Sequence, residues 1–201
     1  MAKATLRIIV PIALVAVLAY FLATRLGYDF PQAPSLQTSP EDSAPPVADS
    51  ARRASPGVYF SGVDRLGDEI IFAINHTTET LDVAVYELNH PGIASAIRAA
   101  QQRGVRARII TDSRKQEQRN SQIPGLRAAG VPIRISEGHT GSRSRMHAKF
   151  GIFDHKLVAV GSFNWSVGGD LRNFEAGVFV ADPELVSQFE AGFERIWSQA
   201  R

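Results

Sequence analysis

The sequence predicts an α/β fold whose strands form a mixed sheet, and three observations support this class. Segments with apolar residues at every second position, typical of strands, recur along the chain. Segments with apolar residues at helical spacing separate several of them, and alternation of strand and helix is typical of α/β proteins. The part of the chain after about residue 58 is also long enough to bury a real core.

The composition is that of an ordinary globular protein, and it narrows the possible chemistry. The chain has 201 residues, of which 44% are apolar and 21% charged. Its formal net charge is only +2, so any attraction for a charged partner must come from local clusters. The absence of cysteine excludes disulfides, thiolate nucleophiles and cysteine-based zinc sites.

Residues 1–28 are predicted to be a membrane anchor or a signal peptide. Lys3 and Arg7 precede a run without charged residues from Ile8 to Thr24. This run is longer than the about 7 to 15 residues of a signal-peptide core and shorter than the roughly 20 of a typical spanning helix. Both alternatives stay open, and the anchor is favoured. Basic residues before the run favour a cytoplasmic N-terminus, so we expect the rest of the chain on the periplasmic or extracytoplasmic side of an inner membrane, or secreted after cleavage.

Residues 29–57 are predicted to be a linker. The segment contains six prolines among alanine, serine, glutamine and acidic residues. Such a composition cannot bury enough apolar surface to offset the entropy lost on ordering, and its prolines favour extended conformations. We therefore interpret residues 29–57 as a tether and residues 58–201 as one folded domain.

The first half of this domain is predicted to alternate helices with strands. Apolar residues at helical spacing predict helices over Val63–His76, from Pro91 to a stop at Gly104, and over about Gln118–Ala129. Alternating apolar residues predict strands over Leu81–Tyr86, Val105–Thr111 and Val131–Ser136. Proline fits the first position of the second helix, and a glycine ends the second and the third helix.

The second half is predicted to contain three more strands and a final helix. The strands are Met146–Phe153, Leu157–Ser162 and Phe174–Ala181. Asp154, His155 and Lys156 make the turn between the first two strands. Asp182 is expected to cap the last helix, with Pro183 at its first position. The apolar stripe of this helix is predicted to face the core and consists of Leu185, Phe189, Phe193, Ile196 and Trp197.

Polar residues on the two neighbouring strands are the candidate functional residues. Residues i and i+2 of a strand point to the same side, so His147 and Lys149 share one face. Ser162 and Asn164 share one face if strand geometry continues past the predicted end. The four polar side chains could therefore converge on one spot.

The stretch from His147 to Asn164 resembles the HKD signature of the phospholipase D superfamily. It reads HAKFGIFD and then, after a gap of six residues, GSFN, with Glu175 downstream. His147, Lys149 and Asp154 thus occupy the pattern H-x-K-x-x-x-x-D. The resemblance covers the chain from about residue 58 to the C-terminus, and a single copy in so short a chain is most similar to the small bacterial endonucleases of that superfamily. It implies a sandwich with a mixed central sheet flanked by helices and one motif per chain.

This resemblance implies hydrolysis of a phosphodiester through a covalent phosphohistidine. His147 would be the nucleophile, which requires an unprotonated ring nitrogen. Lys149, Asn164 and the Ser162 hydroxyl would hold the non-bridging oxygens of the phosphate. Glu175 is the candidate for the carboxylate that orients the histidine ring.

Asp154 belongs to the motif but is expected to have a structural role, holding its turn through local hydrogen bonds. No metal or other cofactor is expected, because the sequence contains no evident acidic cluster for magnesium. A metal cluster of His139, His147 and His155 is the weaker alternative, because their flanks lack a supporting pattern.

Protonation of the leaving group needs a second acid, and one motif supplies one histidine. The resemblance therefore implies a homodimer with a shared site on the two-fold axis. Each chain would contribute His147, Lys149 and Asn164, and the partner's His147 would be the general acid.

Two basic loops bear on the substrate. Arg143 and Arg145 continue the alternate face of His147, and Arg114 and Lys115 follow another strand. We interpret these residues as contacts to a phosphate backbone, so DNA or RNA is the expected substrate. For either cluster alone, solvated surface charges are an equally good interpretation.

Two alternatives stay open. Membrane phospholipid is the first, because the superfamily includes both activities and a tethered domain meets headgroups at high effective concentration. A phospholipase should expose leucine, phenylalanine or tryptophan around its site; the two basic loops offer none, and Trp165 is the one candidate. The second alternative is a non-catalytic nucleic-acid-binding module, which the complete motif disfavours.

Overall fold

Seven strands form one mixed sheet in residues 55–201, the part of the chain that the computed structural model describes. The strands are β1 (Gly57–Phe60), β2 (Thr80–Val85), β3 (Arg106–Asp112), β4 (Ile133–Ser136), β5 (Lys149–Phe153), β6 (Leu157–Gly161) and β7 (Ala176–Val180). Their order across the sheet is β1-β7-β6-β5-β2-β3-β4. β2, β3 and β4 are parallel, and all other neighbours pair antiparallel. The predicted α/β class with a mixed sheet is confirmed.

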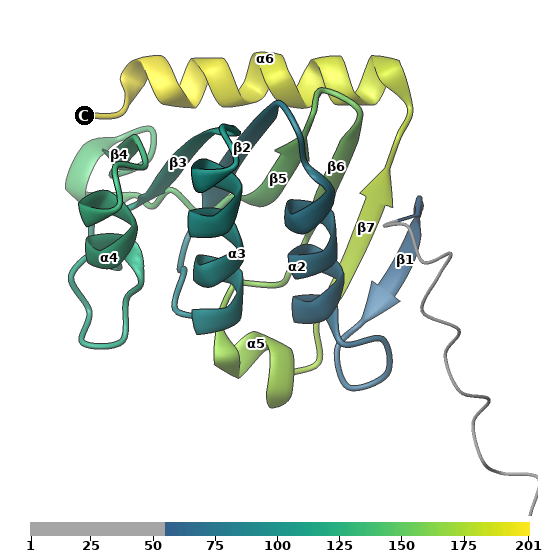
Figure 1. Ribbon diagram of the computed structural model, residues 1–201. Coiled ribbons are helices and arrows are strands. Elements are labelled where there is room, and N and C mark those ends of the chain that lie inside the picture. Colours follow the sequence, from purple (N-terminus) through teal and green to yellow (C-terminus); the bar gives the residue numbers. More distant parts are fainter. Residues whose placement is uncertain (1–54) are drawn as a thin grey trace, which may run out of the picture. The chain divides into compact units, whose positions relative to one another are not determined.

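Helices cover both faces of this sheet (Figure 1). They are α2 (Leu66–His76), α3 (Pro91–Gln102), α4 (Ile123–Ala128), α5 (Val167–Leu171), α6 (Pro183–Gln199) and the short 3-10 helix η1 (Gly141–Arg143). α2, α3 and α4 lie on one face, and α6 lies along the other. Apart from residues 113–122 between β3 and α4, the connections between these helices and the strands next to them in sequence are short, which is typical of α/β domains.

Alternation within each strand divides the core into two apolar clusters, one on each face. On β2, Leu81, Val83 and Val85 pack toward α2 and α3, while Ala84 packs toward α6. Phe193 is the fully buried anchor of α6 in the second cluster. The central strands β2 and β5 are therefore buried on both sides, as their apolar density requires.

Most predicted elements are present with shorter bounds, and two boundaries differ for identifiable reasons. The predicted helix from about Gln118 begins only at Ile123, because the backbone N–H of Gln122 donates to the carbonyl of Leu88 rather than starting a helical turn earlier. The predicted strand from Met146 begins at Lys149, because the Met146 N–H donates to a side chain instead of a neighbouring strand.

The cap of α6 is confirmed, and its apolar stripe is confirmed in part. Asp182 accepts hydrogen bonds from the backbone of Glu184 at 3.0 Å and of Leu185 at 2.9 Å. The side chain of Leu185 is exposed, and its neighbour Val186 instead packs into the core from the first turn of α6.

The predicted anchor or signal, residues 1–28, and most of the predicted linker lie outside the described residues. Among the helices of residues 55–201, none combines the length and the apolarity needed to cross a bilayer.

Candidate active site

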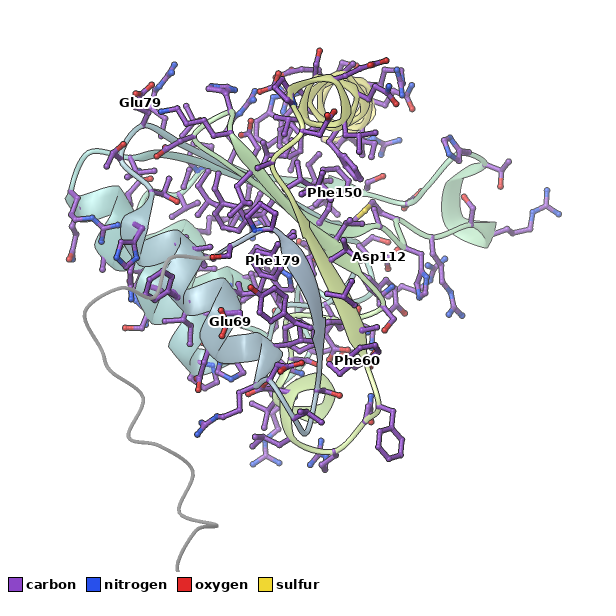
Figure 2. All side chains as sticks on the ribbon, turned by 90° about the vertical axis from the view of Figure 1, so that its right-hand side faces the viewer. Phe60, Glu69, Glu79, Asp112, Phe150 and Phe179 are labelled. Atoms are coloured by element: carbon purple, nitrogen blue, oxygen red, sulfur yellow. The ribbon has the colours of Figure 1, made fainter. Side chains whose placement is uncertain are left out.

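Strand directions bring the predicted residues to one edge of the sheet, which we call the site edge. β2, β3 and β6 end at this edge, and β5 and β7 begin there. His147 lies two residues before β5, Asn164 three residues after β6, and Glu175 directly before β7. In Figure 2, Asp112 at the end of β3 marks the site edge, and Glu79 before β2 marks the opposite edge.

His147 is exposed and has a depressed pKa. Its ring lies against the ring of Tyr86, with centroids 4.8 Å apart. The pKa of the imidazole is lowered from its ordinary value of 6.5 by partial burial first, and then by the positive charges of Lys149 and Arg145, while Asp112 acts in the opposite direction. The neutral ring that a nucleophile requires is thus favoured at neutral pH.

Lys149 is buried beside His147. Only 9% of the residue is exposed, and its Nζ lies 3.2 Å from Nδ1 and 3.4 Å from Nε2 of the His147 ring. The ammonium also donates to the His147 carbonyl at 2.9 Å and lies 5.6 Å from the centroid of the Tyr86 ring. Burial lowers the pKa of Lys149, and the charge of Glu175 partly offsets that effect. The two motif side chains therefore lie together, as predicted, although His147 precedes β5.

A buried carboxylate fixes the segment that leads into His147. Asp112 is fully buried and accepts a hydrogen bond from the Met146 N–H at 3.0 Å and another from the Arg114 N–H at 2.9 Å. Because Met146 directly precedes His147, the bond from its N–H to Asp112 fixes the position of the backbone at His147. Asp112 thus acts in a turn and supports the site without lying in it.

Ser162 and Glu175 form a second pair at the site edge, with partners that differ from the predicted ones. The Ser162 hydroxyl donates to Glu175 Oε2 at 2.5 Å and accepts from the Ala176 N–H at 3.1 Å. The other Glu175 oxygen accepts from Asn173 at 3.1 Å. The predicted hydrogen bond between Glu175 and the His147 ring is therefore not formed within the described chain, and the Ser162 proton points at Glu175 rather than toward a phosphate.

The glycine of the GSFN segment permits this pairing. A Cβ on Gly161 would lie 2.1 Å from the carbonyl oxygen of Ala176, far inside the contact limit. β6 and β7 can approach closely enough for Ser162 to reach Glu175 because position 161 has no side chain.

Asn164 is held between two buried aromatic residues. Phe163 is 4% and Trp165 2% exposed, so both neighbours point into the core. Trp165 packs over Gly151 of β5, where a Cβ would lie 2.9 Å from its ring, and it is not the exposed apolar residue that the sequence suggested. The Asn164 Oδ1 atom is buried and has no hydrogen-bond partner among residues 55–201. The Asn164 carbonyl oxygen thus has an unused acceptor capacity within the described chain.

The basic residues fall into two groups. Arg143 and Arg145 are exposed and make no hydrogen bond or ion pair through their side chains with the rest of the described chain, although η1 takes Arg143 off the predicted strand face. Arg114 pairs with Asp112 and donates to the Ser144 carbonyl at 2.7 Å. Lys115 pairs with Glu87 at 3.5 Å. Internal contacts therefore restrain one of the two predicted basic clusters.

Asp154 lies at the opposite edge and has the structural role predicted for it. One carboxylate oxygen accepts from the backbone and hydroxyl of Thr78, and the other accepts from the backbone N–H groups of Glu79 and Thr80. These four bonds lower the pKa of Asp154 against the opposing effect of burial. They connect the β5–β6 turn to the start of β2. The partners are therefore distant in sequence, whereas local bonds within the turn were expected.

Asp154→Asn should lower the free energy of unfolding by about 2 kcal/mol at pH 7, since an amide has one oxygen for four donors. The folded pKa of Asp154 lies below its unfolded value, so its contribution is complete above the unfolded pKa, ordinarily 3.8, and is lost as the pH falls toward the folded pKa. Urea unfolding of the wild type and the variant at pH 7 and pH 3 measures this. Equal differences at the two pH values would contradict the role of the charge.

Sequence reasoning missed Tyr86, which contacts both motif residues. Its N–H donates to the Ala148 carbonyl at 3.0 Å, and its ring also faces Lys115 Nζ at 5.1 Å. An aromatic residue at the carboxyl end of a fully buried strand is the signal that could have indicated it.

The three histidines of the metal alternative do not converge. His155 lies in the β5–β6 turn at the opposite edge and pairs with Glu190 of α6. Within residues 55–201, no three histidine, aspartate or glutamate side chains are arranged to hold a metal ion.

Comparisons with known proteins agree with this fold and site. Nuc from Salmonella typhimurium, described as a phospholipase D family member, is 27% identical with a TM-score of 0.64, and the match covers 73% of this chain and 97% of that one. NucT from Helicobacter pylori has a TM-score of 0.68 over the same shares at 22% identity, which supports the fold alone. The fold and the motif thus define a phospholipase D-like domain.

Sequence relatives specify the family. The family described as "Cardiolipin synthase, PLD-like domain" matches residues 70–197, so the chain belongs to this family of the phospholipase D superfamily. Mitochondrial cardiolipin hydrolase of Xenopus tropicalis is 32% identical over 136 residues, which are 68% of this chain and 63% of that protein. The human protein of that name is 36% identical over 120 residues, 60% of this chain and 46% of the relative. The chain therefore spans about half to five-eighths of the length of these relatives.

Proposed function

We propose that the protein is a phosphodiesterase of the phospholipase D type that cleaves nucleic acid. The observation that carries the proposal is the pair of a buried ammonium and an exposed, neutral-favouring imidazole, Lys149 and His147, beside two unpaired arginines. Arg143 and Arg145 can follow a phosphate backbone because no carboxylate within the described chain engages them.

The chemistry proceeds in two displacements at phosphorus. The neutral His147 nitrogen attacks, a phosphorus–nitrogen bond forms, and the bond to the leaving oxygen breaks as that oxygen takes up a proton. Water then attacks phosphorus and releases the histidine. Lys149 and the Asn164 amide neutralise and orient the non-bridging oxygens in both steps. Glu175, which accepts a hydrogen bond from Ser162, raises the pKa of Lys149 and so favours the charged ammonium in this scheme.

The substrate is tested by incubating the full chain, dispersed in detergent with EDTA, with single-stranded DNA, RNA, duplex DNA and phospholipid vesicles containing cardiolipin. Nucleic-acid cleavage that is lost in His147→Asn and reduced in Arg143→Gln/Arg145→Gln supports the proposal. Release of lipid headgroups without nucleic-acid cleavage would contradict it. Binding of nucleic acid without turnover would indicate the non-catalytic module.

Phospholipid hydrolysis is the second candidate, and the α5–β7 segment favours it. Phe174 is fully exposed directly beside Glu175, and Leu171 is 66% exposed three residues earlier. Exposed apolar residues of this kind around a site suit acyl chains, and the similarity to cardiolipin hydrolases points the same way. Phe174→Ser should then reduce lipid hydrolysis and leave any nucleic-acid cleavage unchanged.

A second copy of the chain is the proposed partner, because one chain offers a single histidine for nucleophile and acid. The described chain exposes seven large apolar residues, and four of them lie on β1, the turn after it and β7: Val58, Phe60, Val63 and Val178. Val58 and Val178 face each other in the β1–β7 ladder, on the sheet face that α6 leaves uncovered at this end. An apolar face of this extent beside a site suits self-association.

Phe60→Asp should convert a dimer into a monomer and abolish phosphodiesterase activity, because each half-site then lacks its general acid. Phe60 is 52% exposed at the site edge (Figure 2). Leu185→Asp is the matched control, since Leu185 is 43% exposed on α6 and lies outside the apolar face. Sedimentation of the full chain in detergent measures the mass. An active monomer would contradict the shared site.

A further inference from the structure

A buried carboxylate ties the segment that follows Asn164 to the starts of two other helices. The Asp170 side chain is 4% exposed. Its Oδ1 accepts from the Gly67 N–H in the first turn of α2 at 2.8 Å. Its Oδ2 lies 3.4 Å from Nε2 of His90, the N-cap residue of α3. Three elements that are distant in sequence therefore meet at one side chain of α5.

The protonation of the His90 ring follows from its two contacts. Nδ1 accepts a hydrogen bond from the Ile93 N–H at 3.2 Å, so this nitrogen carries no proton. A neutral ring then carries its proton on Nε2, the nitrogen that faces Asp170. The Asp170 side chain also lies at the N-terminal ends of α2 and α3, where helix dipoles interact favourably with a carboxylate. Both oxygens of Asp170 therefore face polar groups.

The position of α5 is transmitted to the backbone of Asn164. A Cβ on Gly169 would lie 2.8 Å from the Phe163 ring and 2.9 Å from the Asn164 carbonyl oxygen, so α5 packs against this residue without a gap. The Trp165 carbonyl accepts from the N–H groups of both Asn89 and His90. A shift of α5 would therefore shift the Asn164 backbone.

No hydrogen bond holds the carbonyl oxygen of the Asn164 side chain within the described chain. Hydrogen bonds of this atom among residues 55–201 therefore do not fix the direction of the amide. Placement of the amide depends on the backbone, which depends on α5. The Asn164 amide must be placed accurately to bind a phosphate, and the packing of α5 against its backbone provides this placement.

We propose that Asp170 is a positioning residue, which holds Asn164 in its phosphate-binding position through α5. The assignment rests on the proposed function, because Asn164 contacts a substrate only if the site acts on a phosphodiester. Asp170 and its partners His90 and Gly67 lie outside the HKD motif, so the proposal extends the site beyond the motif residues.

The test compares Asp170→Asn with Asp82→Asn. The first variant keeps the shape of the side chain but turns an NH₂ group toward the N–H of either Gly67 or His90. Asp82 is the matched control, because it is 5% exposed and accepts two hydrogen bonds from Arg108, away from the site. With a chromogenic phosphodiester, we expect kcat/KM of Asp170→Asn to fall about 10- to 100-fold, and that of Asp82→Asn to stay unchanged although its unfolding midpoint falls.

A readout that is independent of activity separates this proposal from the proposed function. In the full chain, the NMR signals of the Asn164 backbone and side-chain amide should shift in Asp170→Asn and stay in place in Asp82→Asn. Gly67→Ala is the second variant and covers the case in which Asp170→Asn does not fold, since its Cβ would lie 2.7 Å from the Asp170 carboxylate and displace it.

Unmoved Asn164 signals in the Asp170 and Gly67 variants would overturn the positioning role, whatever happens to activity. Wild-type protein that turns over no phosphodiester would overturn the proposed function instead, while the shifts would still decide whether Asp170 places Asn164.

Discussion

Replacing His147 with Asn should lower kcat/KM for the phosphodiester substrate by at least about 10³-fold, because the variant has no group that can form the phosphorus–nitrogen bond. The exposed position of His147 makes a loss of stability small, so unfolding midpoints should match those of the wild type. His139→Asn is the matched control, since His139 is an exposed histidine of the loop that leads to His147. Initial rates for the three proteins measure the effect, and residual activity near that of the control would exclude His147 as the nucleophile.

The pH profile of the wild type gives the same prediction a second readout. Attack requires the unprotonated ring, so kcat/KM should rise with pH through the pKa of His147, which lies below the ordinary 6.5. Arg145→Gln removes one of the charges that lower this pKa, so the acidic limb should move to higher pH. In a symmetric homodimer, one of the two His147 rings must be protonated to act as the general acid. The limbs of the pH profile then report the coupled titration of both rings rather than the pKa of one residue.

The pattern of apolar residues predicted most of the fold because it is clearest in the central strands of the sheet. β2 and β5 are buried along their whole lengths, and their pattern is strong. β1 and α5 have four and five residues, which is too short for a period to emerge. Strand order could not be predicted from periodicity, because the pairing of β1 with β7 joins residues about 120 positions apart.

The sequence predicted the site contacts between residues that are close along the chain, and it did not predict those between distant residues. His147 and Lys149 are two residues apart, so their closeness along the chain lets the two side chains meet. Tyr86 reaches them from the end of β2, and its part depends on the β2–β5 register. The bond between Ser162 and Glu175 was not predicted, because it depends on the close approach of β6 and β7 at Gly161.

Replacing Lys149 with Met should lower kcat/KM about 10²- to 10³-fold while leaving the fold as stable as the wild type, or more stable. Burial lowers the pKa of Lys149, which means that the folded state disfavours its charge. Methionine fills similar space without a charge to desolvate. Steady-state kinetics and urea unfolding of the same samples measure the two effects.

The sign of the stability effect distinguishes a functional lysine from a structural one. Unfolded Lys149 binds its proton more tightly than folded Lys149, so wild-type stability should rise with pH as the residue titrates, and any advantage of Lys149→Met should shrink. Lys115→Met is the control, because Lys115 faces the same Tyr86 ring but pairs with Glu87. A Lys149→Met protein that loses stability and activity together would contradict the assignment. A loss of activity with retained or increased stability is expected only if the buried charge is kept for the phosphate.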